Sequence, residues 1–186
     1  MKFFLGVITT VVVIGLGVVI YPRFGFLSFN ADEQPSATES KLAMDAMDAS
    51  IKRRAPGMTN PVQPTEANLL EAMKLFKTNC ALCHGDPGAP ERVMGKSFYP
   101  PAPQFLKDAP AMPPNHNFYI IKHGIAWTGM PAWGRTLSDD QIWKLTSFLA
   151  QVDKLPPAVD QEWKMGAPAE AGKTGKGSGD MKMKMP

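Results

Sequence analysis

The chain of 186 residues has few cysteines and histidines, two and three respectively, and no large excess of charge of either sign. The formal net charge is +3, and residues 66–156 hold nine Lys and Arg against eight Asp and Glu. A chain without a basic stripe is not expected to bind nucleic acid. Without a field of one sign it is not expected to steer a charged partner over a long distance. No internal repeat is visible.

Both cysteines and one histidine stand together in residues 80–84, Cys-Ala-Leu-Cys-His. This C-x-x-C-H spacing is that of the attachment site for a c-type haem. The thiols of Cys80 and Cys83 can add to the two vinyl groups of one porphyrin, and His84 can then bind the iron from the same side. A chance match, or a redox pair of cysteines before a histidine, is the alternative. The motif predicts one covalently bound haem c.

A sixth ligand for the iron is expected in the Gly-Met-Pro sequence around Met130, three residues before Trp133. Glycine and proline on either side allow a loop to hold the thioether at a fixed point. A thioether opposite an imidazole favours ferrous iron. With twelve methionines in the chain, the Gly-Met-Pro setting distinguishes Met130 from the others. The competing candidates are His116, His123, Met94 and Met112.

The order of these motifs, haem motif first, Gly-Met-Pro later and a final helix last, resembles the class I cytochromes c with His/Met ligation, in their membrane-anchored bacterial form. The resemblance covers about residues 66–152 and implies an all-α cytochrome c fold, with three main helices around one haem. In that family a glycine usually stands four residues before an aromatic residue in the first helix. Here the pair is Ala72 and Phe76, and alanine still permits a close helix crossing.

The haem domain is predicted over residues 66–156. Thr65 is a plausible N-cap for a first helix that ends near residue 78, and a second helix is predicted over 115–123. The last helix is expected to begin with a capping box at Ser138. The intervening segment 85–114 is rich in proline and is predicted to be irregular. The first and last helices should cross, with Phe76 packed against Trp143 or Phe148.

The free ring N–H of His84 is expected to donate to a backbone carbonyl. The resemblance implies a proline carbonyl on the loop after the motif, with Pro100 and Pro101 as candidates. Donors to a haem propionate are sought among side chains near Met130 and in this loop. They are Trp127, Arg135 and, with a weaker claim, Tyr99, while core packing is the alternative for Trp127 and Trp133.

The N-terminal segment, predicted as an anchor over residues 1–22, contains a run from 3 to 21 without a charged residue. As a helix this run nearly spans the hydrocarbon core of a bilayer. A cleavable signal peptide is the alternative, but its apolar region is usually shorter. Cleavage at Ala31 would also put Phe29 where a small residue is needed. The resemblance implies a single-pass anchor in the bacterial inner membrane with the haem domain facing the periplasm.

Residues 23–65 are predicted to be a periplasmic tether. Residues 32–39 have the composition of a linker, and residues 40–54 read as a short amphipathic helix with Met44, Met47 and Ile51 on one face. This helix could dock on a partner complex or pack on the cytochrome itself, and the second reading is favoured because short amphipathic helices usually pack within their own chain.

Residues 157–186 are predicted to be a disordered tail because Pro, Ala, Gly, Lys and Ser dominate them. The last six residues alternate Met and Lys. Clustered thioethers can bind cuprous copper, but the lysines between them would repel the cation. A mobile basic tail is therefore the preferred interpretation.

These features predict an electron carrier without catalytic residues, which exchanges electrons with redox protein partners of a respiratory or photosynthetic system. A filled sixth position at the iron blocks substrate binding. The alternative is a haem with an open or labile sixth position, which would serve gas sensing or peroxidase-like catalysis. A mobile carrier and a fixed subunit of a larger oxidoreductase complex are both compatible with the sequence.

Overall fold

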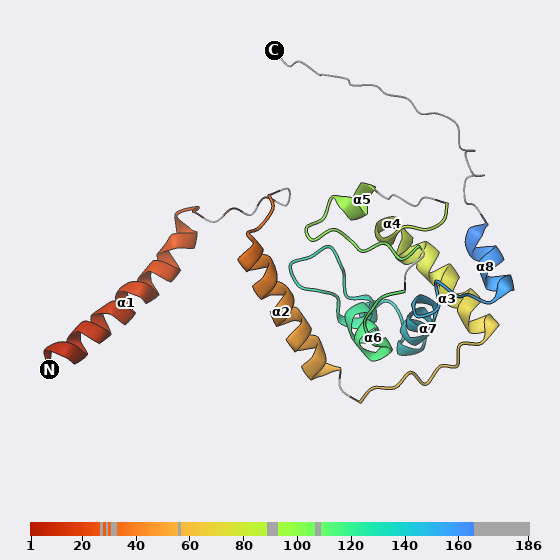
Figure 1. Cartoon of the computed structure of the whole chain (residues 1–186), viewed down its shortest axis with the longest axis horizontal. Coiled ribbons are helices and arrows are strands. Elements are labelled where there is room, and N and C mark those ends of the chain that lie inside the picture. The colour runs from red at the N-terminus through yellow and green to blue at the C-terminus, as the bar shows by residue number, and fades with distance from the viewer. Residues whose placement is uncertain are drawn as a thin grey trace, which may run out of the picture. The chain divides into compact units, whose positions relative to one another are not determined.

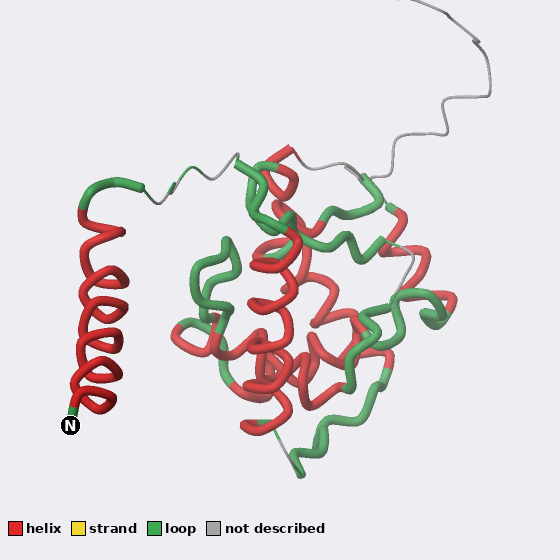
Figure 2. The backbone as a smooth tube through the Cα atoms, turned by 60° about the vertical axis from the view of Figure 1, so that its left-hand side comes forward, coloured by secondary structure: helices red, strands yellow, loops and turns green. Residues whose placement is uncertain are grey.

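The protein is all-helical in the part of the chain that its computed structural model describes, which is residues 1–26, 28, 30, 33–55, 57–88, 93–106 and 109–165. No strand occurs in these residues (Figures 1 and 2). The chain forms two compact units, Met1–Met44 and Asp45–Pro186. The expectation of an all-α protein with one apolar N-terminal helix is confirmed.

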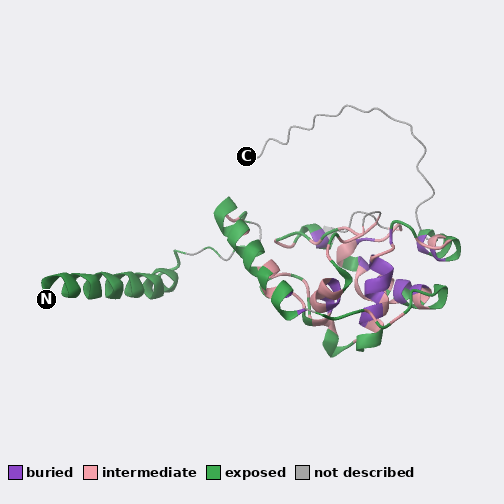
Figure 3. Cartoon of the chain, turned by 60° about the horizontal axis from the view of Figure 1, so that its bottom comes forward, coloured by how far each residue is buried: buried purple, intermediate pink, exposed green. Residues whose placement is uncertain are grey.

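The first unit contains α1, Lys2–Arg23, a helix of 22 residues with a mean hydropathy of 2.7 in its most apolar window. At about 1.5 Å per residue it is about 33 Å long, and all of its residues are exposed (Figure 3). The hydroxyls of Thr9 and Thr10 donate to the carbonyls of Leu5 and Gly6 within the helix. The helix is therefore long and apolar enough to cross a membrane, with these hydroxyls already paired.

The second helix, α2, spans Ala37–Arg54, and its C-terminal part belongs to the haem-motif unit. Ile51 is only 4% exposed, and the next turn continues into the buried Ala55. The side-chain amide of Asn115 donates to the carbonyl oxygen of Ala55 over 2.6 Å. The interpretation that this helix packs on the cytochrome itself is confirmed for its C-terminal end.

The chain after α2 is also bound to the haem-motif unit. The side-chain amide of Asn60 donates to the hydroxyl of Ser147 over 2.7 Å and to the carbonyl of Trp143 over 3.2 Å. Its Oδ1 accepts from the backbone N–H of Val62. A tether that extends to residue 65 is therefore wrong, because Ile51 and Ala55 are buried and Asn60 is hydrogen-bonded to Trp143 and Ser147.

The core of this unit lies where α3, Glu66–Asn79, crosses α7, Asp139–Leu149 (Figure 1). Ala72 is fully buried on α3, and the rings of Phe76 and Phe148 lie 5.7 Å apart. The predicted crossing is confirmed. Both predicted caps are also present, because Thr65 accepts from the N–H of Asn68, and Ser138 and Gln141 form a complete capping box.

The helix α6, Pro114–His123, packs against α7. The ring of Phe118 stacks on that of Trp143 at 4.0 Å, and Lys122 pairs with Asp139 over 2.8 Å. The helix ends at Gly124, whose φ of +67° is in the left-handed region that favours glycine. The predicted helix over 115–123 is confirmed to within one residue.

The last helix, α8, spans Pro157–Lys164, so the prediction of a disordered tail from residue 157 is wrong there. Val159 and Trp163, four residues apart, are both buried. The Trp163 ring packs on Phe76 and Phe148 at 5.7 and 5.2 Å. A helix this short depends on such packing rather than on propensity. The Met/Lys-rich end of the chain lies outside the described residues.

Candidate haem site

The C-x-x-C-H motif forms a single helical turn directly after α3. Cys80 ends α3, and its carbonyl accepts from the backbone N–H groups of Cys83 and His84 at 3.1 and 2.9 Å, which starts α4, Ala81–His84. Residues three and four apart lie on the same face of a helix. The turn thus presents both thiols and the imidazole on one side, and Gly85 ends it with a φ of +76°.

The His84 ring is held by the carbonyl of Pro103, which lies 2.7 Å from Nδ1. Because a carbonyl only accepts, Nδ1 carries the proton and Nε2 is free to bind a metal. Burial lowers the pKa of His84, and the hydrogen bond to Pro103 partly opposes that shift. The prediction of Pro100 or Pro101 as the acceptor is wrong, because the loop brings a later proline of the same run to the ring.

The two cysteines are free and half-buried. Burial, and to a smaller extent the neighbouring Cys83, raises the pKa of the Cys80 thiol to about 12. The Cys80 thiol is therefore protonated at neutral pH.

Met130 lies in a loop that is fixed by its own hydrogen bonds. The Thr128 hydroxyl accepts from the Met130 N–H at 3.1 Å and donates to the carbonyl of Ile125 at 2.9 Å. The Ile125 N–H donates to the Met130 carbonyl at 3.1 Å. A side chain at Gly129 would place its Cβ 2.7 Å from the Phe98 ring. Thr128 and Phe98 were not predicted, although a hydroxyl residue two positions before the methionine is a usable signal.

The surroundings of the competing ligands favour Met130. The Met130 side chain is partly buried against the core cluster, whereas Met94 is 46% exposed. His123 is exposed at the C-terminal end of α6, and its ring packs on Tyr119 at 4.5 Å. His116 lies in the first turn of the same helix, as expected. Met112 is half-buried just before that helix.

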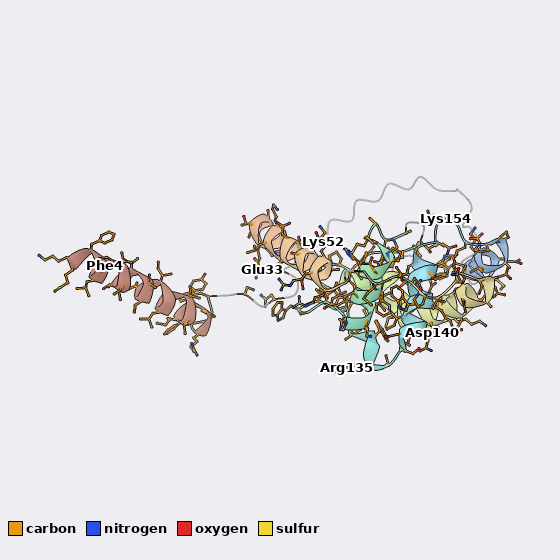
Figure 4. The ribbon with its side chains drawn as sticks, turned by 90° about the horizontal axis from the view of Figure 1, so that it is seen from below. Phe4, Glu33, Lys52, Arg135, Asp140 and Lys154 are labelled. Atoms are coloured by element: carbon orange, nitrogen blue, oxygen red, sulfur yellow. The ribbon has the colours of Figure 1, made fainter. Side chains whose placement is uncertain are left out.

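The predicted propionate donors occupy different environments. Trp127 is 99% exposed, and its φ of +59° is unusual for a bulky side chain. The alternative that Trp127 packs in the core is therefore wrong. The same alternative is right for Trp133, which is partly buried and packs against the core. Arg135 is exposed at the end of the short helix η1, Trp133–Arg135 (Figure 4), and Tyr99 is half-buried. A propionate contact by these residues stays a prediction, and so does any contact of Pro101.

These residues fit a haem c. One turn offers two thiols and an imidazole with a free Nε2, and a hydrogen-bonded loop offers a thioether. Two thiols, an imidazole and a thioether are the donor set that suits an iron held in a porphyrin.

Comparisons with known proteins agree with this geometry. The family model described as cytochrome C oxidase, cbb3-type, subunit III, matches residues 67–149. A curated relative, the cbb3-type cytochrome c oxidase subunit FixPc of Rhizobium leguminosarum bv. viciae, is 32% identical over 134 residues, which cover 66% of this chain and 42% of the relative. The chain thus spans less than half the length of that relative.

A solved structure, the Kuenenia stuttgartiensis reducing HAO-like protein complex Kustc0457/Kustc0458, matches at 23% identity and a TM-score of 0.34. The match covers 52% of this chain and 47% of that chain, and so low a score adds nothing to the argument.

The helical fold, the C-x-x-C-H turn and the match over residues 67–149 show that this domain is similar to the c-type cytochromes, which transfer electrons, and in particular to subunit III of cbb3-type cytochrome c oxidases.

Proposed function

We propose that this protein is a membrane-anchored monohaem electron carrier, with its haem domain on the periplasmic side of the bacterial inner membrane. Cys80 and Cys83 would hold the haem covalently, and His84 and Met130 would bind its iron. The observation that carries the proposal is the hydrogen bond from His84 Nδ1 to Pro103, which leaves Nε2 free for iron. When bound, the haem supplies a one-electron ferric/ferrous couple.

The residues of the chain would hold that group. The α4 turn presents the thiols and the imidazole together, and the Thr128 bonds keep the Met130 loop in place. With the Met130 thioether bound to the iron, no position would remain for a substrate, so the protein itself is not an enzyme in this proposal. The chain contains two cysteines, which supports a single haem.

The partners are membrane-bound redox proteins. The curated relative is named as a subunit of a cytochrome c oxidase, and the apolar α1 helix would keep this chain in the same membrane as such a complex. We therefore assign it a place as a subunit of, or a tethered carrier for, a respiratory oxidoreductase complex.

Spectroscopy of the purified full-length protein tests the function. Haem should stay with the chain after acid–acetone extraction, and the ferric form should show the weak near-red band of a thioether–iron bond. Met130→Ala should abolish that band and allow carbon monoxide to bind the ferrous form, because it opens the sixth position. Met94→Ala, at an exposed methionine, should leave both properties unchanged.

Two outcomes contradict the proposal. Extractable haem in the wild-type chain would rule out the covalent attachment. Rapid carbon monoxide binding by the wild-type ferrous protein would favour the alternative of an open site for gas sensing or peroxidase-like catalysis.

A further inference from the structure

Residues 102–105, here called the proximal clamp, are bonded to the haem motif and to the segment before them. The backbone N–H of Ala102 donates to the carbonyl of Gly95 at 2.8 Å, and the N–H of Phe105 donates to the carbonyl of His84 at 3.3 Å. Between them, the Pro103 carbonyl accepts from the His84 ring at 2.7 Å. The clamp therefore contacts both the main chain and the side chain of His84.

The side chain of Gln104 completes these bonds. Its amide nitrogen donates to the carbonyl of Cys83 at 2.9 Å and to that of Ala102 at 3.0 Å, which uses both of its N–H groups. Its Oε1 is buried and has no hydrogen-bond partner in the described residues. A buried acceptor without a partner destabilises a fold. Gln104 therefore stabilises the fold through its amide nitrogen, which links the clamp to the C-x-x-C-H turn.

Phe105 acts on the imidazole directly. Its ring lies 5.0 Å from that of His84, centroid to centroid, with an angle of 18° between the planes. A ring stacked on one face of the imidazole resists rotation about the bond from Cβ to Cγ, while the hydrogen bond to Pro103 fixes the protonated nitrogen. Two residues of the clamp thus restrict the plane of the His84 ring.

We propose that Gln104 and Phe105 are positioning residues that fix the plane of the His84 ring and lower the reduction potential of the iron. This inference rests on the proposed role of His84 as an axial ligand. A well-aligned hydrogen bond from Nδ1–H to a carbonyl raises the basicity of a ligating imidazole. A more basic ligand favours the ferric state, so loosening the clamp should favour the ferrous state.

The test uses the full-length haem-loaded protein with Gln104→Met, which keeps the size but removes both N–H donors, and Phe105→Leu, which removes the stacked ring. At an applied potential fixed near the wild-type midpoint potential, each variant should show a ratio of reduced to oxidised protein about tenfold higher than that of the wild type. For a one-electron couple this equals an upward shift of about 59 mV. The paramagnetic NMR shifts of the ferric form, which report the imidazole plane, should also change.

Two control variants separate positioning from general loss of packing. Phe148→Leu makes the same substitution in the core, where Phe148 contacts Phe76 and Trp163, and it should lower stability without moving the potential or the NMR pattern. Phe105→Tyr keeps the stacked ring and should retain the wild-type values.

The inference is overturned if Gln104→Met and Phe105→Leu match the Phe148→Leu control, or if their potential falls. The wild-type protein is measured first. If it lacks covalent haem or the thioether band, the proposed function fails and this inference fails with it. If it shows both and the variants do not differ from the control, only the positioning role fails.

Discussion

At the scale of single residues, the proposed haem site combines residues recognised by motif with residues identified from their contacts. The motif residues are Cys80, Cys83, His84 and Met130. Spacing does not distinguish Pro103 from its neighbouring prolines, and Thr128 stands two positions before Met130. Their hydrogen bonds decide which imidazole nitrogen is free and where the methionine loop lies. Residues that orient the ligands are thus as much a part of this site as the ligands.

Trp127 provides a test at this scale. Its backbone is left-handed and its side chain is 99% exposed, so the residue is strained without a packing gain. A left-handed conformation costs an ordinary residue about 1–2 kcal/mol, and asparagine tolerates it better. We expect Trp127→Asn to raise the free energy of unfolding by about 0.5–1 kcal/mol, measured by guanidinium unfolding of the haem-loaded protein.

Trp127→Ala serves as the comparison, because it removes the ring and keeps the strained backbone. It should leave the stability close to that of the wild type. Equal losses in both variants would contradict this expectation and favour the predicted contact of the indole with a haem propionate.

At the scale of elements, the crossing of α3 and α7 is extended by α8. The Lys77 ammonium on α3 donates to the carbonyl of Glu162 near the C-terminal end of α8 at 2.9 Å, and it lies 5.5 Å from the centre of the Trp163 ring. The cation therefore both caps the short helix and contacts its buried indole. This arrangement makes α8 part of the haem domain.

Trp163 should carry most of the stability that α8 adds, because it is 2% exposed. We expect Trp163→Ala to lower the free energy of unfolding by about 3–5 kcal/mol. The indole N–H has no hydrogen-bond partner in the described residues. Trp163→Phe, which keeps a ring and removes that N–H, should therefore cost less than about 1.5 kcal/mol. Denaturant unfolding measures both, and equal losses would contradict a packing role for the ring.

At the scale of the whole molecule, the connection between the apolar helix and the haem domain is short. Only residues 24–36 separate α1 from α2, and thirteen extended residues reach at most about 45 Å. In the proposed membrane-anchored arrangement, a short link of this kind would give a high effective concentration toward partners in the same membrane. It also agrees with a haem domain that carries nearly equal numbers of both charges, since no long-range steering is required.

The start of a soluble fragment matters because Ile51 and Ala55 are buried and Asn60 is hydrogen-bonded to α7. A fragment that begins at Asp45 keeps the buried Ile51 and the hydrogen bonds of Asn60, whereas one that begins at Thr65 loses both. We expect the shorter fragment to be less stable by about 3 kcal/mol, with an unchanged visible spectrum. Guanidinium unfolding of the two haem-loaded fragments measures this difference, and equal midpoints with equal slopes would contradict it.

The anchor should matter more than salt for electron exchange. At equal bulk concentration, the fragment from Asp45 should exchange electrons with native membranes much more slowly than the anchored protein, because it lacks the tether. Ionic strength should change either rate only modestly. Stopped-flow absorbance at the haem bands measures both rates. Equal rates, or a mature N-terminus found near Ala31 by mass spectrometry, would contradict the tether argument.

The sequence by itself determined the features that depend on fixed covalent spacing or on local backbone chemistry. The C-x-x-C-H motif could be read directly because two thiols and an imidazole must match one porphyrin. The caps at Thr65 and Ser138 and the end of α6 at Gly124 could be predicted because each depends on its own and nearby residues.

The tertiary structure decided what depends on contacts between distant residues. Asn60 and Trp163 lie in segments whose composition resembles linkers. Only the hydrogen bonds of Asn60 to α7, and the burial of Trp163 against rings of α3 and α7, show that they belong to the haem domain. The choice of Pro103 over its neighbouring prolines likewise depends on the path of the loop past His84. Local sequence patterns cannot predict these contacts, because several positions along the chain have the same local features. Only the folded chain brings one of those positions into contact.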